Sequence, residues 1–163
     1  MTYFTKFPAI AAPFNGSIVL ITDFLRRVGI GSTFQEVSSA LMPYTIKEGE
    51  RPEDVAYAFY GNPTYHWVVL LVNNIVNVYE EWPLDQTTLV EKVQEEYANP
   101  YATHHYIDSA TGLVVDFSLD LGIVAVSNLE HEINLNDAKR NVRLLDKRYL
   151  DTFVRSFETL VSD

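Results

Sequence analysis

The segment from Tyr44 to Ile75, YTIKEGERPEDVAYAFYGNPTYHWVVLLVNNI, constrains the fold more than any other part of the sequence. Its alternating start ends at a glycine, which predicts a short strand followed by a turn. Pro52 stands where proline is tolerated, in the first turn of a helix, and Gly61 supplies a left-handed stop. We therefore expect one helix over Pro52–Tyr60 and, after Pro63, a second helix that is apolar nearly all round and buried on more than one side.

Periodicity and turn residues predict three further elements. Asp85 is placed to cap an acidic amphipathic helix that stops before Pro100. The run HHYIDSATGLVVDFS predicts a β-hairpin around Ser109–Gly112. Apolar residues recur at helical spacing from Tyr149 to Val161, and they predict a C-terminal amphipathic helix.

The first seventeen residues contain two prolines, a glycine and four aromatic residues without a regular period, and they predict an extended N-terminal arm. The four aromatic residues are Tyr3, Phe4, Phe7 and Phe14. Because their exposure would create an apolar patch, the arm must pack either on its own domain or on a neighbouring protein, and both alternatives stay open. The run SIVLITDFLRRVGIG then predicts a strand leading into a short helix. Its Arg26 and Arg27 form either a solvated face or a contact with carboxylates of a partner.

Together these elements predict an α+β fold made of several small elements instead of one large sheet. We divide the chain into three parts. These are an N-terminal arm with a short strand and helix (1–43), a core (44–82), and a subdomain of helix, β-hairpin and C-terminal helix (83–163).

Composition excludes several classes of function. The net charge of −10, from 22 acidic and 12 basic residues, opposes binding to a nucleic-acid backbone. The absence of cysteine removes disulfides, thiol catalysis and thiolate metal sites. The sequence starts without a basic region followed by a long apolar run, and it has no apolar stretch of about 18 residues, so we expect neither a signal peptide nor a membrane partner.

No pattern for catalysis, a cofactor or a metal stands out. His104 and His105 are adjacent, so on a regular strand they would point to opposite faces and could not share one ion without distortion. His131 lies in EHE, whose glutamates would face away from it in an extended segment. No GxSxG motif or phosphate-binding glycine loop is present, and the acidic pairs are typical of solvated helix surface. We expect no enzyme activity, no cofactor and no metal site.

The segment from Tyr44 to Ile75 resembles a LysM (lysin motif) module in its Tyr-rich strand, glycine turn, two helices and closing NN. The resemblance implies a βααβ core whose second strand would fall around Val76–Tyr79. In glycan-binding modules of that family, two loops form a groove for N-acetylglucosamine chains, and here they would be Gly49–Glu53 and Asn73–Val78. The first loop carries Arg51 among other charged residues, in place of the usual small and apolar ones.

A longer resemblance covers nearly the whole chain. The blocks YFTKFP, DFLRRVGI, EGERPEDVAYAFYGNPTYHWVVLLVNNI, EEWPLD and NLEHEINLNDAKRNVRLLDKRYLDTFVRSFETL occur in this order. They are similar to the small LysM-containing baseplate wedge protein of contractile-tailed bacteriophages. The resemblance implies a structural virion protein of the tail baseplate, present in six copies and assembled in the host cytoplasm. It also implies other wedge proteins, the sheath-initiating protein and central hub proteins as partners. The alternative function is a LysM-type module that binds N-acetylglucosamine or peptidoglycan.

Several residues are candidates for contact with such partners. We expect Trp67 to belong to the core, and Trp82, before a proline, to anchor an interface. Arg51 adds a charged, stiff surface to the LysM-like segment. One basic cluster in this acidic chain either solubilises a helix face or contacts an acidic neighbour. The cluster consists of Lys139, Arg140, Arg143, Lys147 and Arg148.

Overall fold

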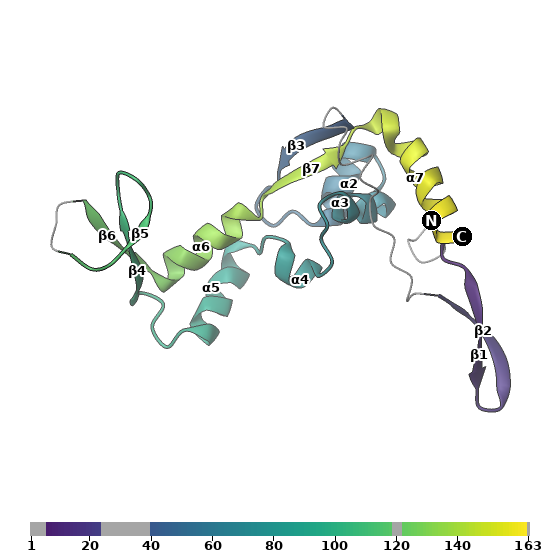
Figure 1. Ribbon diagram of the computed structural model, residues 1–163, viewed down its shortest axis with the longest axis horizontal. Coiled ribbons are helices and arrows are strands. Elements are labelled where there is room, and N and C mark those ends of the chain that lie inside the picture. Colours follow the sequence, from purple (N-terminus) through teal and green to yellow (C-terminus); the bar gives the residue numbers. More distant parts are fainter. Residues whose placement is uncertain (1–5, 24–39, 119–121, 163) are drawn as a thin grey trace. The chain divides into compact units, whose positions relative to one another are not determined.

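The computed structural model describes residues 6–23, 40–118 and 122–162, and it divides into two compact units (Figure 1). Unit 1 draws on Met1–Thr45, Glu50–Tyr79 and Val142–Asp163, and unit 2 draws on Ile46–Gly49 and Glu80–Asn141. Each unit contains both helices and strands, so the α+β class is confirmed. Among the described residues, no helix has the length and hydropathy required to cross a bilayer.

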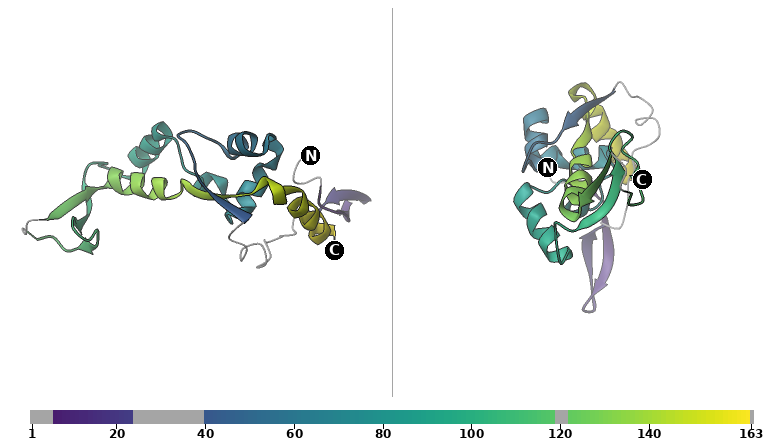
Figure 2. Two further views of the ribbon diagram at one scale, coloured as in Figure 1. Left: turned by 90° about the horizontal axis from the view of Figure 1, so that it is seen from above. Right: turned by 90° about the vertical axis from the view of Figure 1, so that its left-hand side faces the viewer.

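The N-terminal part of unit 1 is a β-hairpin. Strand β1 (Ala9–Phe14) pairs antiparallel with strand β2 (Ser17–Thr22), and the two ribbons lie side by side in both views of Figure 2. The turn is Asn15-Gly16, whose φ angles are 46° and 78°. Positive φ at both positions is what a two-residue type I′ loop requires, and Asn-Gly is the sequence that favours it. The arm is therefore extended as expected, but it folds back on itself.

Unit 1 continues with a strand, a pair of helices and, much later in the sequence, a second strand. Strand β3 (Leu41–Thr45) is followed by helix α2 (Pro52–Tyr60), the 3₁₀ helix η3 (Pro63–Tyr65) and helix α3 (His66–Val72). The partner of β3 is strand β7 (Asn141–Leu145). The second strand expected around Val76–Tyr79 is not formed, because residues Val78–Glu81 form the short helix α4. The strand that completes the β-α-α-β order is contributed by a distant part of the sequence.

Local signals at the two ends of α2 act as the sequence predicts. Pro52 occupies the first turn, where its missing N–H costs no helical hydrogen bond. Gly61 has φ 78°, and its N–H donates to Tyr57 C=O at 2.9 Å, which ends the helix. The hydroxyl of Tyr60 donates to Leu145 C=O at 3.0 Å and ties α2 to β7.

The core of unit 1 forms between α3 and the C-terminal helix α7 (Lys147–Ser162). Trp67 of α3 lies against Phe157, with ring centroids 4.6 Å apart, so its predicted place in the core is confirmed. The buried positions of α7 follow one another at steps of three or four, which sets a single apolar stripe on the helix. They are Leu150, Phe153, Phe157 and Val161. From the sequence, we placed this helix in the subdomain of residues 83–163. In the structure, its apolar stripe packs in the core of unit 1.

Unit 2 combines two helices with a small antiparallel sheet. Helix α5 (Gln86–Glu96) begins as predicted at Asp85, whose carboxylate accepts from Thr88 N–H at 3.0 Å. The sheet has the order β5-β4-β6. Its strands are β4 (Thr103–Asp108), β5 (Val114–Val115) and β6 (Ile123–Ser127). Strands β4 and β5 form the hairpin that was expected around Ser109–Gly112.

Helix α6 (Asn128–Ala138) was not predicted from the sequence. Its signal is the pattern Ser-x-x-Glu, in which the Ser127 hydroxyl accepts from Glu130 N–H and the Glu130 carboxylate accepts from Ser127 N–H. The segment has few apolar residues on one side, so hydrophobic periodicity gives no helical signal there. The capping residues alone would have located its start.

Candidate partner-contact surfaces

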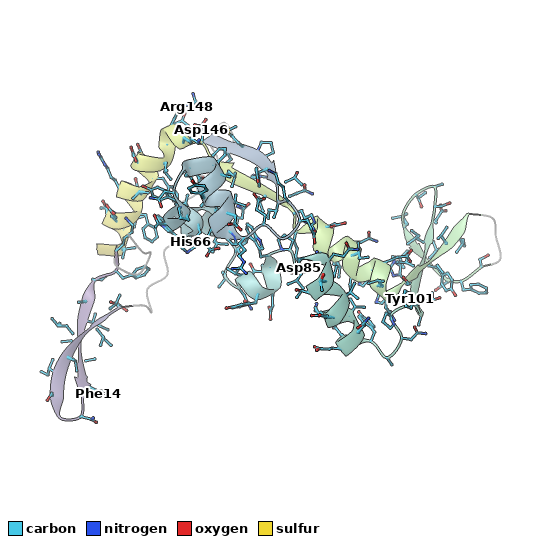
Figure 3. The ribbon with its side chains drawn as sticks, turned by 180° about the vertical axis from the view of Figure 1, so that it is seen from behind. Phe14, His66, Asp85, Tyr101, Asp146 and Arg148 are labelled. Atoms are coloured by element: carbon cyan, nitrogen blue, oxygen red, sulfur yellow. The ribbon has the colours of Figure 1, made fainter. Side chains whose placement is uncertain are left out.

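The hairpin of β1 and β2, called here the N-terminal hairpin (Ala9–Thr22), exposes apolar residues on both faces. Cross-strand partners share a face, so the pairs Ile10–Ile21 and Ala12–Val19 lie on one side, and Ala11–Leu20 and Pro13–Ile18 on the other. Phe14, at the tip in Figure 3, is 68% exposed, and Ile18 and Leu20 are 79% and 74% exposed. The hairpin contains no charged residue. A surface of this kind typically marks a contact site for another protein.

The hairpin is joined to the core of unit 1 at its base. Asp23 N–H donates to Pro8 C=O at 2.8 Å, Lys6 forms an ion pair with Glu158, and the Phe7 ring meets Phe157 edge-on at 6.2 Å. Phe7 is only 8% exposed, which corrects the expectation that it contacts a partner. It is buried because the chain enters the hairpin directly over the aromatic core. The remaining residues of the N-terminal hairpin extend beyond that anchor.

Other predicted contact residues fall into two groups. Tyr3, Phe4, Arg26 and Arg27 lie outside the described residues. Trp82 is 6% exposed within unit 2, so it is a core residue and not the exposed anchor that its place before a proline suggested.

The basic cluster is divided between the units, and several of its charges already have partners within the chain. In unit 2, the Arg140 guanidinium binds Asp137 at 2.9 Å and also pairs with Glu48. Lys139 Nζ donates to Glu80 C=O at 2.6 Å. Because these groups hold the fold of unit 2, their charge is only partly available to an acidic neighbour.

The rest of the basic cluster belongs to unit 1. Arg148 is 75% exposed at the side chain and forks onto Asp146, with contacts of 2.7 Å and 3.1 Å (Figure 3). The hydrogen bonds from Arg148 lower the pKa of the Asp146 carboxyl. Lys147 Nζ lies 5.3 Å from the centre of the Phe59 ring, and Arg143 is exposed on β7. An exposed ion pair of this kind contributes little to stability, and Asp146 offsets the charge of Arg148.

The loop that would form one side of a LysM-type groove is organised by Glu50. Both oxygens of its carboxylate accept the Tyr44 hydroxyl, at 2.8 Å and 2.9 Å. Burial, followed by the hydrogen bond and the charge of Glu50, raises the pKa of Tyr44 to about 12. Arg51 is exposed beside it, and its N–H donates to the Asp54 carboxylate at 3.0 Å. These contacts fix the loop through charged and phenolic groups.

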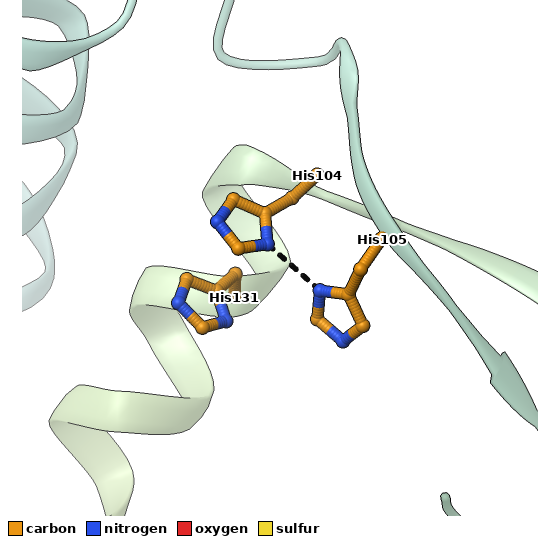
Figure 4. Close-up of side chains that lie close together, drawn as sticks. All are labelled: His104, His105 and His131. Atoms are coloured by element: carbon orange, nitrogen blue, oxygen red, sulfur yellow. Dashed lines mark hydrogen bonds between the residues drawn. The ribbon is translucent and has the colours of Figure 1, made fainter. Parts of the chain in front are cut away.

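Three histidines of unit 2 lie together, contrary to the expectation from the sequence (Figure 4). His104 and His105 of β4 do not point to opposite faces, because a β-bulge interrupts the ladder between Thr103 and His105. His131 is on helix α6, not on an extended segment, and its ring stacks on that of His104 with centroids 3.9 Å apart. Burial, and then the neighbouring His131 and His105, lower the pKa of His104. Each of the three rings offers one nitrogen donor, so the cluster is a candidate metal site.

Comparison with known proteins identifies the class of protein to which this chain belongs. Residues 2–113 match the family model described as base plate wedge protein 53, which covers more than half of the chain. The chain belongs to this family. The family is one of structural baseplate wedge proteins and not a family of enzymes.

One characterised relative is baseplate wedge protein gp53 of Enterobacteria phage T4, which is 37% identical to this chain over 85 residues. The alignment covers 52% of this chain and 43% of the T4 protein, so the similar part spans less than half of that relative. Neither comparison supports the alternative of a glycan-binding module.

Proposed function

We propose that this protein is a structural part of a contractile phage tail baseplate, in which it joins wedge subunits to one another. Family membership supports the role, and the observation that carries it is the N-terminal hairpin. A two-stranded hairpin without a third strand is at best marginally stable in water. One with apolar residues on both faces and no charge is suited to burial between partner proteins.

The proposed role also includes particular partner proteins. We propose that the partners are other wedge proteins, the sheath-initiating protein and the central hub proteins, with six copies per baseplate and assembly in the host cytoplasm. The absence of cysteine is compatible with a reducing compartment. Among the described residues, β1 and β2 pair only with each other. A strand of a neighbour that pairs with an outer edge would add main-chain hydrogen bonds to the apolar contact.

Replacement of the N-terminal hairpin tests the proposal. A Gly-Gly link between Pro8 and Asp23 removes Ala9–Thr22 but keeps Lys6 and Phe7 in the core. We expect the variant to remain folded, because the removed side chains are mostly exposed, and to fail to copurify with coexpressed wedge proteins of the same phage. Circular dichroism measures folding, and size-exclusion chromatography of the coexpressed proteins measures assembly.

Point variants refine the test. Changing Ile18 and Leu20 to Thr keeps the strands but removes apolar contact area, and we expect it to weaken assembly as well. Leu113→Thr, at a residue 66% exposed in unit 2, is the matched control and should assemble normally. If the hairpin variants assemble like the unchanged chain, the hairpin is not the contact with wedge proteins.

A further inference from the structure

Three of the four histidines in the sequence meet in unit 2, where β4 begins and α6 makes its first turns. Each ring offers one nitrogen, and these three atoms all lie within 4.8 Å of one another. His104 Nδ1 and His105 Nδ1 are 2.8 Å apart. The His105 ring is nearly perpendicular to both others, at 85°, whereas the His104 and His131 rings are stacked, 10° from parallel, with centroids 3.9 Å apart (Figure 4).

A β-bulge brings the two adjacent histidines together. In the β4–β6 ladder, Thr103 is opposite Ser127 and His105 is opposite Val126, which leaves His104 as an extra residue without a cross-strand partner. A bulge of this kind bends the strand and re-aims a side chain. The geometry therefore removes the obstacle that a regular strand would impose on two consecutive ligands.

The third ligand is held in place by the start of α6. Asn128 N–H donates to Ala102 C=O at 3.0 Å and Leu129 N–H donates to Pro100 C=O at 2.9 Å, so the segment before β4 is tied to the first turn of the helix. The capping box of Ser127 and Glu130 fixes the same turn. His131 follows directly, which means that its position relative to His104 and His105 is set by main-chain hydrogen bonds.

Three imidazole nitrogens suit a metal ion that is intermediate between hard and soft. Imidazole nitrogen suits Zn²⁺, Cu²⁺, Ni²⁺ and Co²⁺, and three such donors with one open position resemble the ligand number of tetrahedral zinc sites. Zinc–nitrogen bonds of about 2.0–2.1 Å place ligand nitrogens about 3.3 Å apart in a tetrahedron. Here His104 Nδ1 and His105 Nδ1 are 2.8 Å apart, and the three donor atoms all lie within 4.8 Å of one another. Because imidazole binds a metal in the plane of its ring, the stacked His104 or His131 ring must turn out of the stack when the ion binds.

We propose that His104, His105 and His131 bind one Zn²⁺ ion, with water as the fourth ligand in the free chain. The ion would connect strand β4 to helix α6 and stabilise unit 2 through binding that the unfolded chain cannot match. The site would thus have a structural role, independent of the surface that contacts wedge proteins. At a free Zn²⁺ concentration about 100 times the dissociation constant, we expect the melting temperature to rise by about 5–10 °C.

Titration of the chain with zinc chloride tests the proposal. The chain is prepared without a polyhistidine tag, treated with a chelator and studied by isothermal titration calorimetry. We expect saturable binding of one ion per chain. His104→Gln, His105→Gln and His131→Gln should each weaken this binding by about tenfold or more. Replacement by Co²⁺ should give the visible absorption of a four-coordinate site.

His66→Gln is the matched control, because His66 is the fourth histidine and lies on α3 in unit 1. It should bind zinc like the unchanged chain. Nitrogen-15 spectra of histidine side chains give a test that needs no variant, since zinc should shift the ring signals of three histidines and not of His66. No saturable binding, equal loss in the His66 variant, or unshifted rings of the three histidines would each overturn the proposal.

Discussion

At the scale of single residues, two asparagine side chains connect parts of the chain that are far apart in sequence. The amide of Asn73 binds both main-chain groups of Arg143, with each contact at 2.8 Å, and also donates to Val69 C=O. The amide of Asn136 accepts from Leu84 N–H at 2.8 Å and donates to Leu84 C=O at 2.9 Å. Each amide satisfies both the N–H and the C=O of one main-chain residue, as buried main-chain groups require.

Asn136 is 3% exposed, so its loss should leave the main-chain groups of Leu84 poorly satisfied. We expect Asn136→Ala to lower the free energy of unfolding by about 1–3 kcal/mol, measured by urea denaturation followed by circular dichroism. The control is Asn134→Ala, at an exposed position of the same helix, which should change stability by no more than about 0.5 kcal/mol. Equal effects of the two variants would show that the hydrogen bonds between Asn136 and Leu84 do not contribute to stability.

At the scale of elements, α7 is the best example of a helix that is made stable by packing. Its apolar stripe meets the rings of Trp67 and Phe7, while the opposite side contains charged residues. Helix α6 is the contrasting case, because a cap and hydrogen bonds to the segment before β4 define it. Hydrophobic periodicity therefore predicts α7 but gives no signal for α6.

Phe157 packs against two aromatic rings and is 3% exposed, whereas Leu160, on the same helix, is 57% exposed. Phe157→Ala removes a large buried side chain and leaves a cavity, so we expect a loss of about 3–5 kcal/mol in the free energy of unfolding. Leu160→Ala should stay within about 0.5 kcal/mol. Chemical denaturation of both variants measures the difference, and a small effect of Phe157→Ala would show that α7 is dispensable for the core.

At the scale of the whole molecule, net charge and apolar surface have opposite effects on self-association. The net charge of −10 favours solubility through repulsion between molecules, while the N-terminal hairpin offers an uncharged apolar surface for association. Protonation of carboxylates removes the repulsion as the pH falls toward the isoelectric point of about 4.7. Self-association of the free chain should therefore depend on both pH and the hairpin.

We expect turbidity of the purified chain to be low at pH 7 and to reach a maximum near pH 4.7. The variant that lacks Ala9–Thr22 retains every charged residue of the chain, so it is a control with the same titration. It should show clearly less turbidity at the same pH and concentration. Equal turbidity of the two proteins would mean that charge alone controls association.

Local patterns were sufficient for much of this protein. Proline and glycine at the ends of α2, the cap at Asp85, the β4–β5 hairpin and the stripe of α7 were all predicted, because each depends on residues that are near neighbours in sequence. The order of sequence blocks also indicated the baseplate wedge family, which the family comparison shows.

Contacts between distant residues decided the rest. The sequence could not pair β3 with β7, bury Phe7 and Trp82, or place His104 and His105 beside His131. Each of these results depends on hydrogen bonds or packing across many residues, and a single extra residue in a β ladder reverses the direction of a side chain. Much of the secondary structure and the family were thus predictable from the sequence itself, whereas the choice between core and surface positions was decided by the tertiary structure, which also brought the three histidines together.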